Sequence, residues 1–141
     1  MKSTKKKGNR VIILGCSKFG ASIARQLSKE GESVLVIDNK ESAFDKLEEE
    51  FSGYTIVADA TDIQTLENNE IADAKKVIIS TDNDNINVFL AHVCSKFYNI
   101  HEIYVRLSDT RKGKLIEKDE NIRAIYPFVL SMDYFNRLSR D

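Results

Sequence analysis

The sequence has little of what marks a secreted, metal-binding or membrane-spanning protein. It contains two cysteines, two histidines, one proline and no tryptophan. No stretch approaches the ~20 consecutive apolar residues of a transmembrane helix. The apolar run after the first lysines, VIIL, is also shorter than the roughly 7–15 residues of a signal-peptide core. We therefore expect a cytoplasmic protein with no direct membrane span.

The cysteines and histidines do not form a motif. Cys16 and Cys94 are far apart, and neither belongs to a C-x-x-C pair. Together with His92 and His101 they show no metal-ligand spacing, so we predict no metal site. Cys94 lies in an apolar helical stretch and is expected to be a small core residue. Cys16 lies in a glycine-rich turn, and we predict an unreactive side chain there.

Neither sign of charge dominates the chain. The 21 basic and 22 acidic residues leave a net charge of −1, which gives no reason to expect a nucleic-acid partner. The one local cluster of like charges is basic and lies at the start of the sequence, MKSTKKKGNR. We interpret residues 1–9 as a flexible tail; contact with anionic lipid or another subunit is the alternative.

Short β-branched runs alternate with helical segments along one domain of ordinary size. The six predicted strands are residues 10–14, 33–38, 54–58, 76–80, 102–107 and 123–127. The predicted helical segments between them are residues 18–31, 40–53, 61–71, 83–99 and 110–121. The central strands are continuously apolar, as expected of parallel strands covered on both faces. The alternation predicts an α/β Rossmann-type doubly wound parallel sheet of six strands over residues 10–127, in the order 3-2-1-4-5-6.

A final amphipathic helix is predicted over residues 128–141. Its apolar residues are unusually many for a terminal element with no strand after it: Phe128, Leu130, Met132, Phe135 and Leu138. We expect half of this surface to pack on the chain's own sheet and the rest to contact a partner chain.

The segment 10–31 is close to a dinucleotide-binding fingerprint. Against the pattern G-x-G-x-x-G, Gly15 and Gly20 match and Ser17 replaces the middle glycine. Gly15 lets the chain turn off the strand, and Gly20 lets the helix pack closely on the sheet. The amide groups at the start of that helix can bind phosphate.

Ser17 and its neighbour Lys18 bear on which nucleotide fits. The Cβ atom of Ser17 narrows the gap to a pyrophosphate, although its hydroxyl can itself donate to phosphate. Lys18 adds a positive charge suited to a β- or γ-phosphate; an ordinary surface lysine is the competing interpretation. These two residues favour ATP, ADP or AMP at least as much as NAD.

Asp38 ends the second strand, 18 residues after Gly20. A carboxylate at this position accepts hydrogen bonds from the hydroxyls of an adenosine ribose and repels a 2′-phosphate, so NADP is disfavoured. The alternative is a solvated acid that caps the next helix.

Other polar residues follow strands whose ends face the same crevice. After the third strand, Asp59 and Thr61 can bind an adenine edge or its ribose, while Thr61 is also predicted to cap the next helix. After the fourth strand come Ser80, Thr81 and Asp82, which can approach phosphate; alternatively Asp82 or Asp84 caps the long helix. Arg106, at the end of the fifth strand, can pair with phosphate or with a carboxylate such as that of Asp109.

In this order of motifs, residues 10–138 resemble the TrkA N-terminal, or RCK (regulator of K⁺ conductance), domain family. The stretches that carry the resemblance are VIILGCSKFGASIARQLSKEGESVLVID, ADATDIQTLENNEIADAKKVIISTDNDNINV, EIYVRLSD and NIRAIYPFVLSMDYFNRL. The sequence departs from the family pattern at Ser17, at Lys18 where arginine is usual, and at Ala58 where glycine is usual. The family's C-terminal ligand-binding domain would have to come from a separate polypeptide, unless the protein acts alone as a nucleotide sensor.

The resemblance implies a cytoplasmic regulatory subunit rather than an enzyme. Such subunits gate an inner-membrane K⁺ channel or transporter in response to NAD(H), ATP, ADP or AMP, and they assemble as dimers or larger rings. The terminal helix from Phe128 would be the crossover helix that swaps onto a neighbour. By position, the glycine-rich turn would contact the phosphates, and residues 59–61 would contact the adenosine side. The later loops would contact the second ribose or the phosphates. The implied cofactor-binding residues are Gly15, Cys16, Ser17, Lys18, Phe19, Gly20, Asp38, Asn39, Asp59, Ala60, Thr61, Ser80, Thr81, Asp82 and Arg106.

Two other functions remain open from the sequence. A small NAD-dependent oxidoreductase would need a substrate domain, but the sheet and its helices use the whole length. No Tyr-x-x-x-Lys pair is present either, so we predict no catalytic residues. A scaffold that has lost nucleotide binding through Ser17 is the other alternative.

Overall fold

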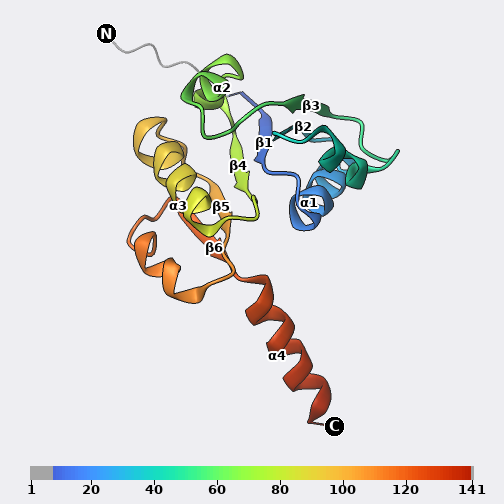
Figure 1. The fold of residues 1–141 in the computed structure, drawn as a ribbon, viewed down its shortest axis with the longest axis vertical. Coiled ribbons are helices and arrows are strands. Elements are labelled where there is room, and N and C mark those ends of the chain that lie inside the picture. Colours follow the sequence, from blue (N-terminus) through green and yellow to red (C-terminus); the bar gives the residue numbers. More distant parts are fainter. Residues whose placement is uncertain (1–7, 141) are drawn as a thin grey trace.

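A computed structural model describes residues 8–140, so most of the predicted basic tail lies outside the described residues. Six parallel strands form one sheet in the order β3-β2-β1-β4-β5-β6, which confirms the predicted topology (Figure 1). The strands are β1 (Arg10–Leu14), β2 (Ser33–Asp38), β3 (Tyr54–Val57), β4 (Lys76–Ile79), β5 (Ile103–Arg106) and β6 (Ile122–Ile125).

The connections combine α-helices with tighter turns. The α-helices are α1 (Lys18–Lys29), α2 (Ile63–Asn68), α3 (Asp84–His92) and α4 (Pro127–Ser139). Three short 3-10 helices are η1 (Glu41–Leu47), η2 (Ile71–Asp73) and η4 (Thr110–Leu115). A π-helical turn, η3 (Val93–Phe97), extends α3.

The continuously apolar strands bury both faces of the sheet. Successive side chains of a strand point to opposite faces. Val11 and Ile13 of β1 accordingly belong to a core with α1 and η1, whereas Ile12 and Leu14 belong to the core with α2 and α3. Figure 1 shows α1 and α3 on opposite sides of β1 and β4. Cys94 is fully buried in the α3 core, as predicted.

Two segments predicted as helices form only short 3-10 turns. In the segment 40–53 the helix ends at Leu47, because Glu48 adopts a positive φ of 58° and the chain turns back to β3. In the segment 110–121 the helix ends at Leu115. Gly113 there lies against the ring of Tyr126, whose hydroxyl would be 1.9 Å from an added Cβ atom. Glycine also weakens a helix by about 1 kcal/mol relative to alanine.

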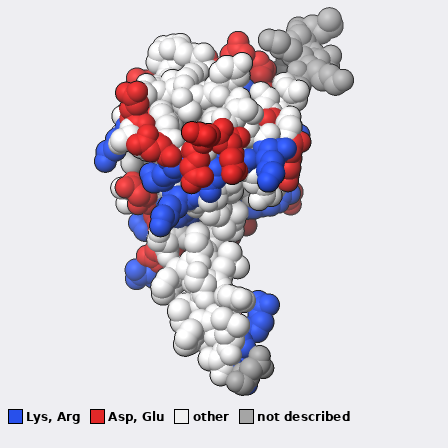
Figure 2. Space-filling model, turned by 90° about the vertical axis from the view of Figure 1, so that its right-hand side faces the viewer, with Lys and Arg blue, Asp and Glu red and all other residues white. Residues whose placement is uncertain are grey.

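The terminal helix α4 projects from the body of the domain (Figure 1). Pro127 starts it directly after the edge strand β6, and no residue of α4 is buried. The expectation that half of this helix packs on its own sheet is therefore wrong, because the chain leaves the sheet at its edge. Figure 2 shows α4 as a mostly uncharged surface beside a charged body. Its exposed large apolar residues are Phe128, Leu130, Met132, Tyr134, Phe135 and Leu138.

Within residues 8–140, none of the helices has the length and apolar character needed to cross a lipid bilayer.

Candidate functional site

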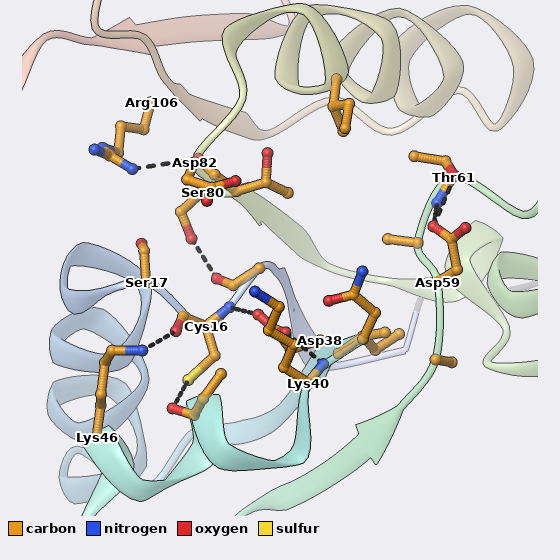
Figure 3. Close-up of a pocket in the computed structure, with 18 of the residues that line it drawn as sticks. Cys16, Ser17, Asp38, Lys40, Lys46, Asp59, Thr61, Ser80, Asp82 and Arg106 are labelled. Carbon is orange, nitrogen blue, oxygen red and sulfur yellow. Dashed lines mark hydrogen bonds between the residues drawn. The ribbon is translucent and has the colours of Figure 1, made fainter.

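A cavity of about 530 Å³ lies at the carboxyl ends of the strands (Figure 3). It brings together every predicted cofactor-binding residue except Phe19 and Gly20. Its wall consists of Gly15, Cys16, Ser17, Lys18, Ile37, Asp38, Asn39, Lys40, Ala43, Lys46, Ala58, Asp59, Ala60, Thr61, Ser80, Thr81, Asp82, Ile86 and Arg106. Ligands of open α/β sheets bind at this edge, where the order of the strands reverses.

The turn after β1 requires glycine at its first position. Gly15 has a φ of +99°. A Cβ atom there would lie 2.6 Å from the backbone nitrogen of Thr81. The amide of Gly15 donates to the carbonyl oxygen of Ile37 at 2.8 Å, which fixes the turn against the end of β2.

Ser17 occupies the middle-glycine position without backbone strain. Its φ of −79° and ψ of 176° are extended values open to any residue. Its Oγ atom accepts the amide proton of Gly20 at 3.2 Å, so Ser17 is the N-cap of α1. Because Oγ acts as the acceptor in that bond, the hydroxyl proton remains available to a ligand. Within residues 8–140, no acceptor takes the amide protons of Lys18 and Phe19 in the first turn of α1.

Phe19 and Gly20 are not among the residues of the cavity wall, and both pack behind the turn. Phe19 is half-buried against the core between α1 and the sheet. A Cβ atom on Gly20 would lie 2.3 Å from the Oγ atom of Ser80 and 2.5 Å from the carbonyl oxygen of Gly15. The Phe19 ring and the close approach at Gly20 thus hold α1 against the sheet, while a phosphate contact through the backbone amide of Phe19 stays a prediction.

The Asp38 carboxylate is held in place by two backbone amides. Its Oδ2 atom accepts the amide proton of Cys16 at 2.8 Å, and its Oδ1 atom accepts that of Lys40 at 2.8 Å. Asp38 does not cap η1, whose N-cap residue is Lys40. A carboxylate has about four acceptor positions, so two remain for the hydroxyls of a ligand.

Asp59 and Thr61 form a closed turn at the other side of the cavity. Asp59 Oδ1 accepts from the backbone amide of Thr61 at 2.9 Å and from its hydroxyl at 2.7 Å. These bonds, the side-chain one first, lower the pKa of Asp59. The predicted capping role of Thr61 is wrong: Asp62 is the N-cap of α2 and accepts from the amide of Gln64 at 3.0 Å.

The loop after β4 is held by a residue that sequence reasoning missed. Asn87 on α3 is buried, and its Oδ1 atom accepts from the amide and the hydroxyl of Thr81. Its Nδ2 atom donates to the carbonyl oxygens of Thr81, at 3.1 Å, and Arg106, at 2.8 Å. The only signal in the sequence was an amide on an otherwise apolar helical face. The hydroxyl proton of Ser80 is also used within the protein, since it is donated to the carbonyl oxygen of Gly15 at 2.7 Å.

Neither Asp82 nor Asp84 caps α3. Asn83 is its N-cap and accepts from the amide of Ile86 at 3.0 Å, because the extended backbone at Asn83 places its side chain over the first turn. The carboxylate of Asp84 instead accepts the amide protons of Ser108 and Asp109 after β5.

Arg106 extends over the same loop. Its Nη1 atom donates to the carbonyl oxygen of Thr81 at 3.2 Å. It does not pair with Asp109, whose carboxylate lies 2.9 Å from the guanidinium of Arg111, two residues along the chain. That guanidinium lowers the pKa of Asp109.

A second missed residue, Lys46, places a cation beside the glycine-rich turn. Its Nζ atom donates to the carbonyl oxygen of Cys16 at 3.2 Å. Lys46 lies on the 3-10 helix η1 and lines the cavity. The α-helix predicted for this segment gave no reason to expect Lys46 there. The Cys16 side chain is buried and donates to the carbonyl oxygen of Ala43 at 3.3 Å. Burial raises the pKa of the Cys16 thiol, although the nearby Lys46 opposes this.

The cavity has two chemically different ends. In Figure 3, Ser17, Lys46 and Arg106 lie at one side and Asp59 and Thr61 at the other, with the Asp38 carboxylate between them. The first side offers a hydroxyl, cations and free helix amides, which suit an anionic group. The other side offers the carboxylate and hydroxyl of the closed turn, which suit the polar edge of a base or sugar.

Comparisons with known proteins identify related sequences and structures. Residues 11–127 match the TrkA-N domain family. A "Trk system potassium uptake protein TrkA homolog" from Pyrococcus horikoshii is 30% identical over 122 residues, which are 86% of this chain and 53% of the relative. The chain thus spans about half the length of that relative.

Solved structures share the fold. The TrkA-N domain of the inner membrane protein ybaL from Escherichia coli superposes with a TM-score of 0.79 at 15% identity, over 92% of this chain and 96% of that one. The GsuK channel bound to NAD gives a TM-score of 0.79 at 20% identity, over 96% of this chain and 24% of the channel. GsuK bound to ADP gives a TM-score of 0.78 at 21% identity, over 92% of this chain and 33% of that one.

Proposed function

The chain belongs to the TrkA-N domain family, and we propose that it is a nucleotide-binding regulatory domain of a membrane potassium transport system. The observation that carries the proposal is the fixed carboxylate of Asp38 beside the free amides of the glycine-rich turn. This pairing suits a molecule that has both a ribose and a phosphate group. Relatives with the same domain are named as potassium uptake proteins, which supports the regulatory role.

The proposed ligand lies across the cavity with its ribose on Asp38. The two remaining acceptor positions of that carboxylate bind the 2′- and 3′-hydroxyls. The phosphates lie on the amides of Lys18 and Phe19 and on the hydroxyl of Ser17, with Lys46 and Arg106 at the same side. The adenine edge lies toward Asp59 and Thr61.

The ligand class is an adenine nucleotide: NAD(H), ATP, ADP or AMP. The GsuK channel, which shares the fold, is known bound to NAD and bound to ADP, and this supports the class. NADP is disfavoured because a 2′-phosphate would lie against the Asp38 carboxylate. The cations at the phosphate side favour a ligand with two or more phosphate groups over AMP.

We further propose that α4 joins two copies of the chain. Its large apolar side chains are exposed along the whole helix, and burial of such a surface drives association. The resulting dimer, or a larger ring, acts in the cytoplasm on an inner-membrane potassium channel or transporter. Nucleotide occupancy then sets the shape of the assembly rather than a chemical reaction.

A thermal-shift panel tests the proposed ligand class. Purified chain is heated with ATP, ADP, AMP, NAD⁺, NADH or NADPH, each in large excess. A ligand at 100 times its Kd stabilises the folded state by about 2.7 kcal/mol, which raises the melting temperature by several degrees. We expect stabilisation by ADP, ATP or NAD(H) and a smaller effect of NADPH. If no adenine nucleotide raises the melting temperature, the proposal is wrong.

A further inference from the structure

Arg106 lies between two cavities. It lines the nucleotide cavity described above, and it also lines a second cavity of about 410 Å³ at the start of α4. The other residues of the second cavity are Ser108, Pro127, Phe128 and Ser131. Arg106 therefore borders both the proposed phosphate side and the cavity at the first turn of the projecting helix.

The backbone of Arg106 is fixed, so its side chain is the part that can move. The carbonyl oxygen of Arg106 accepts from the buried Nδ2 atom of Asn87 at 2.8 Å. The next residue, Leu107, donates to the carbonyl oxygen of Ile125 on β6 at 2.9 Å. Asn87 also holds Thr81, which is the hydrogen-bond partner of the Arg106 guanidinium.

The guanidinium of Arg106 has no counter-charge among residues 8–140. No carboxylate in this part of the chain lies within 4.0 Å of it, and its hydrogen bond goes to the neutral carbonyl of Thr81. The side chain is half-buried, where a cation gains more from an anionic partner than it does in bulk water. It is therefore available to an anion that enters the nucleotide cavity.

Among residues 8–140, the helix that Arg106 borders meets the body of the domain at its first turn and projects from there (Figure 1). No residue of α4 is buried, and the residue before it, Tyr126, packs on Gly113 of η4. A helix of 13 residues is about 20 Å long. A small change at the first turn therefore moves its far end by a larger distance.

We propose that Arg106 couples occupancy of the nucleotide cavity to the first turn of α4, with Asn87 as its positioning residue. This inference rests on the proposed function. A phosphate group in the first cavity forms charge-assisted hydrogen bonds with the guanidinium and shifts the Arg106 side chain at the boundary of the two cavities. Pro127, Phe128 and Ser131 then repack, which changes the direction of α4.

A fluorescent probe in the second cavity tests the coupling. Ser131→Cys is labelled in the full chain with an environment-sensitive dye; both native cysteines are buried, so the unsubstituted chain serves as the labelling blank. ADP binding is measured separately by calorimetry. We expect saturating ADP to shift the emission of the probe. In the Arg106→Ala background ADP should bind about tenfold more weakly, equivalent to one lost charge-assisted bond, and should give no shift at saturation.

Matched variants separate coupling from general effects. A probe at Lys29→Cys, at the far end of α1 and outside both cavities, should not respond to ADP. Asn87→Ala, or Asn87→Asp if the alanine variant does not fold, should reduce the Ser131 response. Val88→Ala, which also opens space beside α3, should preserve it.

The outcomes distinguish this inference from the proposed function. A full probe shift in Arg106→Ala at saturating ADP overturns the coupling. ADP binding without any probe shift in the chain with native Arg106 also overturns it, and leaves the proposed function intact. Absence of ADP binding to that chain overturns both.

Discussion

The carboxylate of Asp38, at the end of β2, accepts the amide proton of Cys16 across the first turn at 2.8 Å. These residues are 22 positions apart, and the bond joins the glycine-rich turn to the neighbouring strand. The same carboxylate faces the cavity. Asp38 therefore both closes the turn and offers acceptors to a ligand.

Replacement of Asp38 by asparagine is expected to weaken both functions. The amide keeps the size of the side chain, but it can accept only through one oxygen and carries no charge. We expect ADP affinity to fall about tenfold and the free energy of unfolding to fall by about 1 kcal/mol. Calorimetric titration and urea unfolding measure the two effects.

Asp82→Asn is the control for the loss of charge. Asp82 lines the same cavity but is exposed. We expect its substitution to change ADP affinity by no more than about twofold, as is usual for a solvated surface charge. Equal losses in the two variants would contradict the specific role of Asp38.

Gly15→Ala and Gly31→Ala separate crowding from backbone strain. Both glycines have a positive φ, +99° and +89°. An added Cβ atom on Gly15 meets backbone atoms at 2.6–2.8 Å, whereas one on Gly31 meets no atom of the described residues within 4 Å. We expect a loss of about 1 kcal/mol for Gly31→Ala and at least about 2 kcal/mol more for Gly15→Ala, measured by urea unfolding. Similar losses would show that the turn relaxes around the new side chain.

The sequence predicted the sheet and the position of the cavity more reliably than the detail of the loops. Apolar strands such as Val11–Leu14 can only be buried on both faces, and parallel order then places their ends together. Helix caps depend on one or two dihedral angles, so a prediction is easily wrong by one residue. Thr61 was predicted to cap α2, but the cap is Asp62. Asp84 was a predicted cap of α3, but the cap is Asn83. Lys46 and Asn87 were missed because their roles depend on contacts with distant turns.

Stability is expected to fall at alkaline pH because of buried thiol and phenol groups. Burial raises the pKa of Cys94 from 9.0 to about 12, and burial with a hydrogen bond to Glu67 raises that of Tyr98 from 10.0 to about 12. The unfolded chain loses these protons first, so the stability they contribute is complete below pH 9 and is lost as pH rises toward 12.

Cys94→Ala tests this pH dependence. Urea unfolding under reducing conditions should show a decline between pH 9 and 10 in the unsubstituted chain and a shallower decline in the variant, because alanine cannot ionise. The variant is also expected to be less stable at neutral pH through lost packing. Parallel pH profiles for the two proteins would contradict the assignment to Cys94.

Association through α4 is expected to depend on its apolar side chains. The unsubstituted chain should be at least a dimer by light scattering at low micromolar concentration. Met132→Glu with Phe135→Glu should give a monomer, because both side chains are exposed within one chain and adjacent on the helix. Asn136→Glu, which adds charge to the same helix, should remain associated. A monomeric unsubstituted chain would contradict the role of α4.

An amide NMR titration of the chain with ADP tests directly whether a nucleotide binds at the glycine-rich turn. Nucleotide binding at the glycine-rich turn should give the largest chemical-shift changes at the amides of Lys18 and Phe19, which lack an acceptor among residues 8–140. Asp38 and Thr61 should also shift, and amides at the far end of α1 should not. Unchanged amide shifts at Lys18 and Phe19 with saturating ADP would contradict the account.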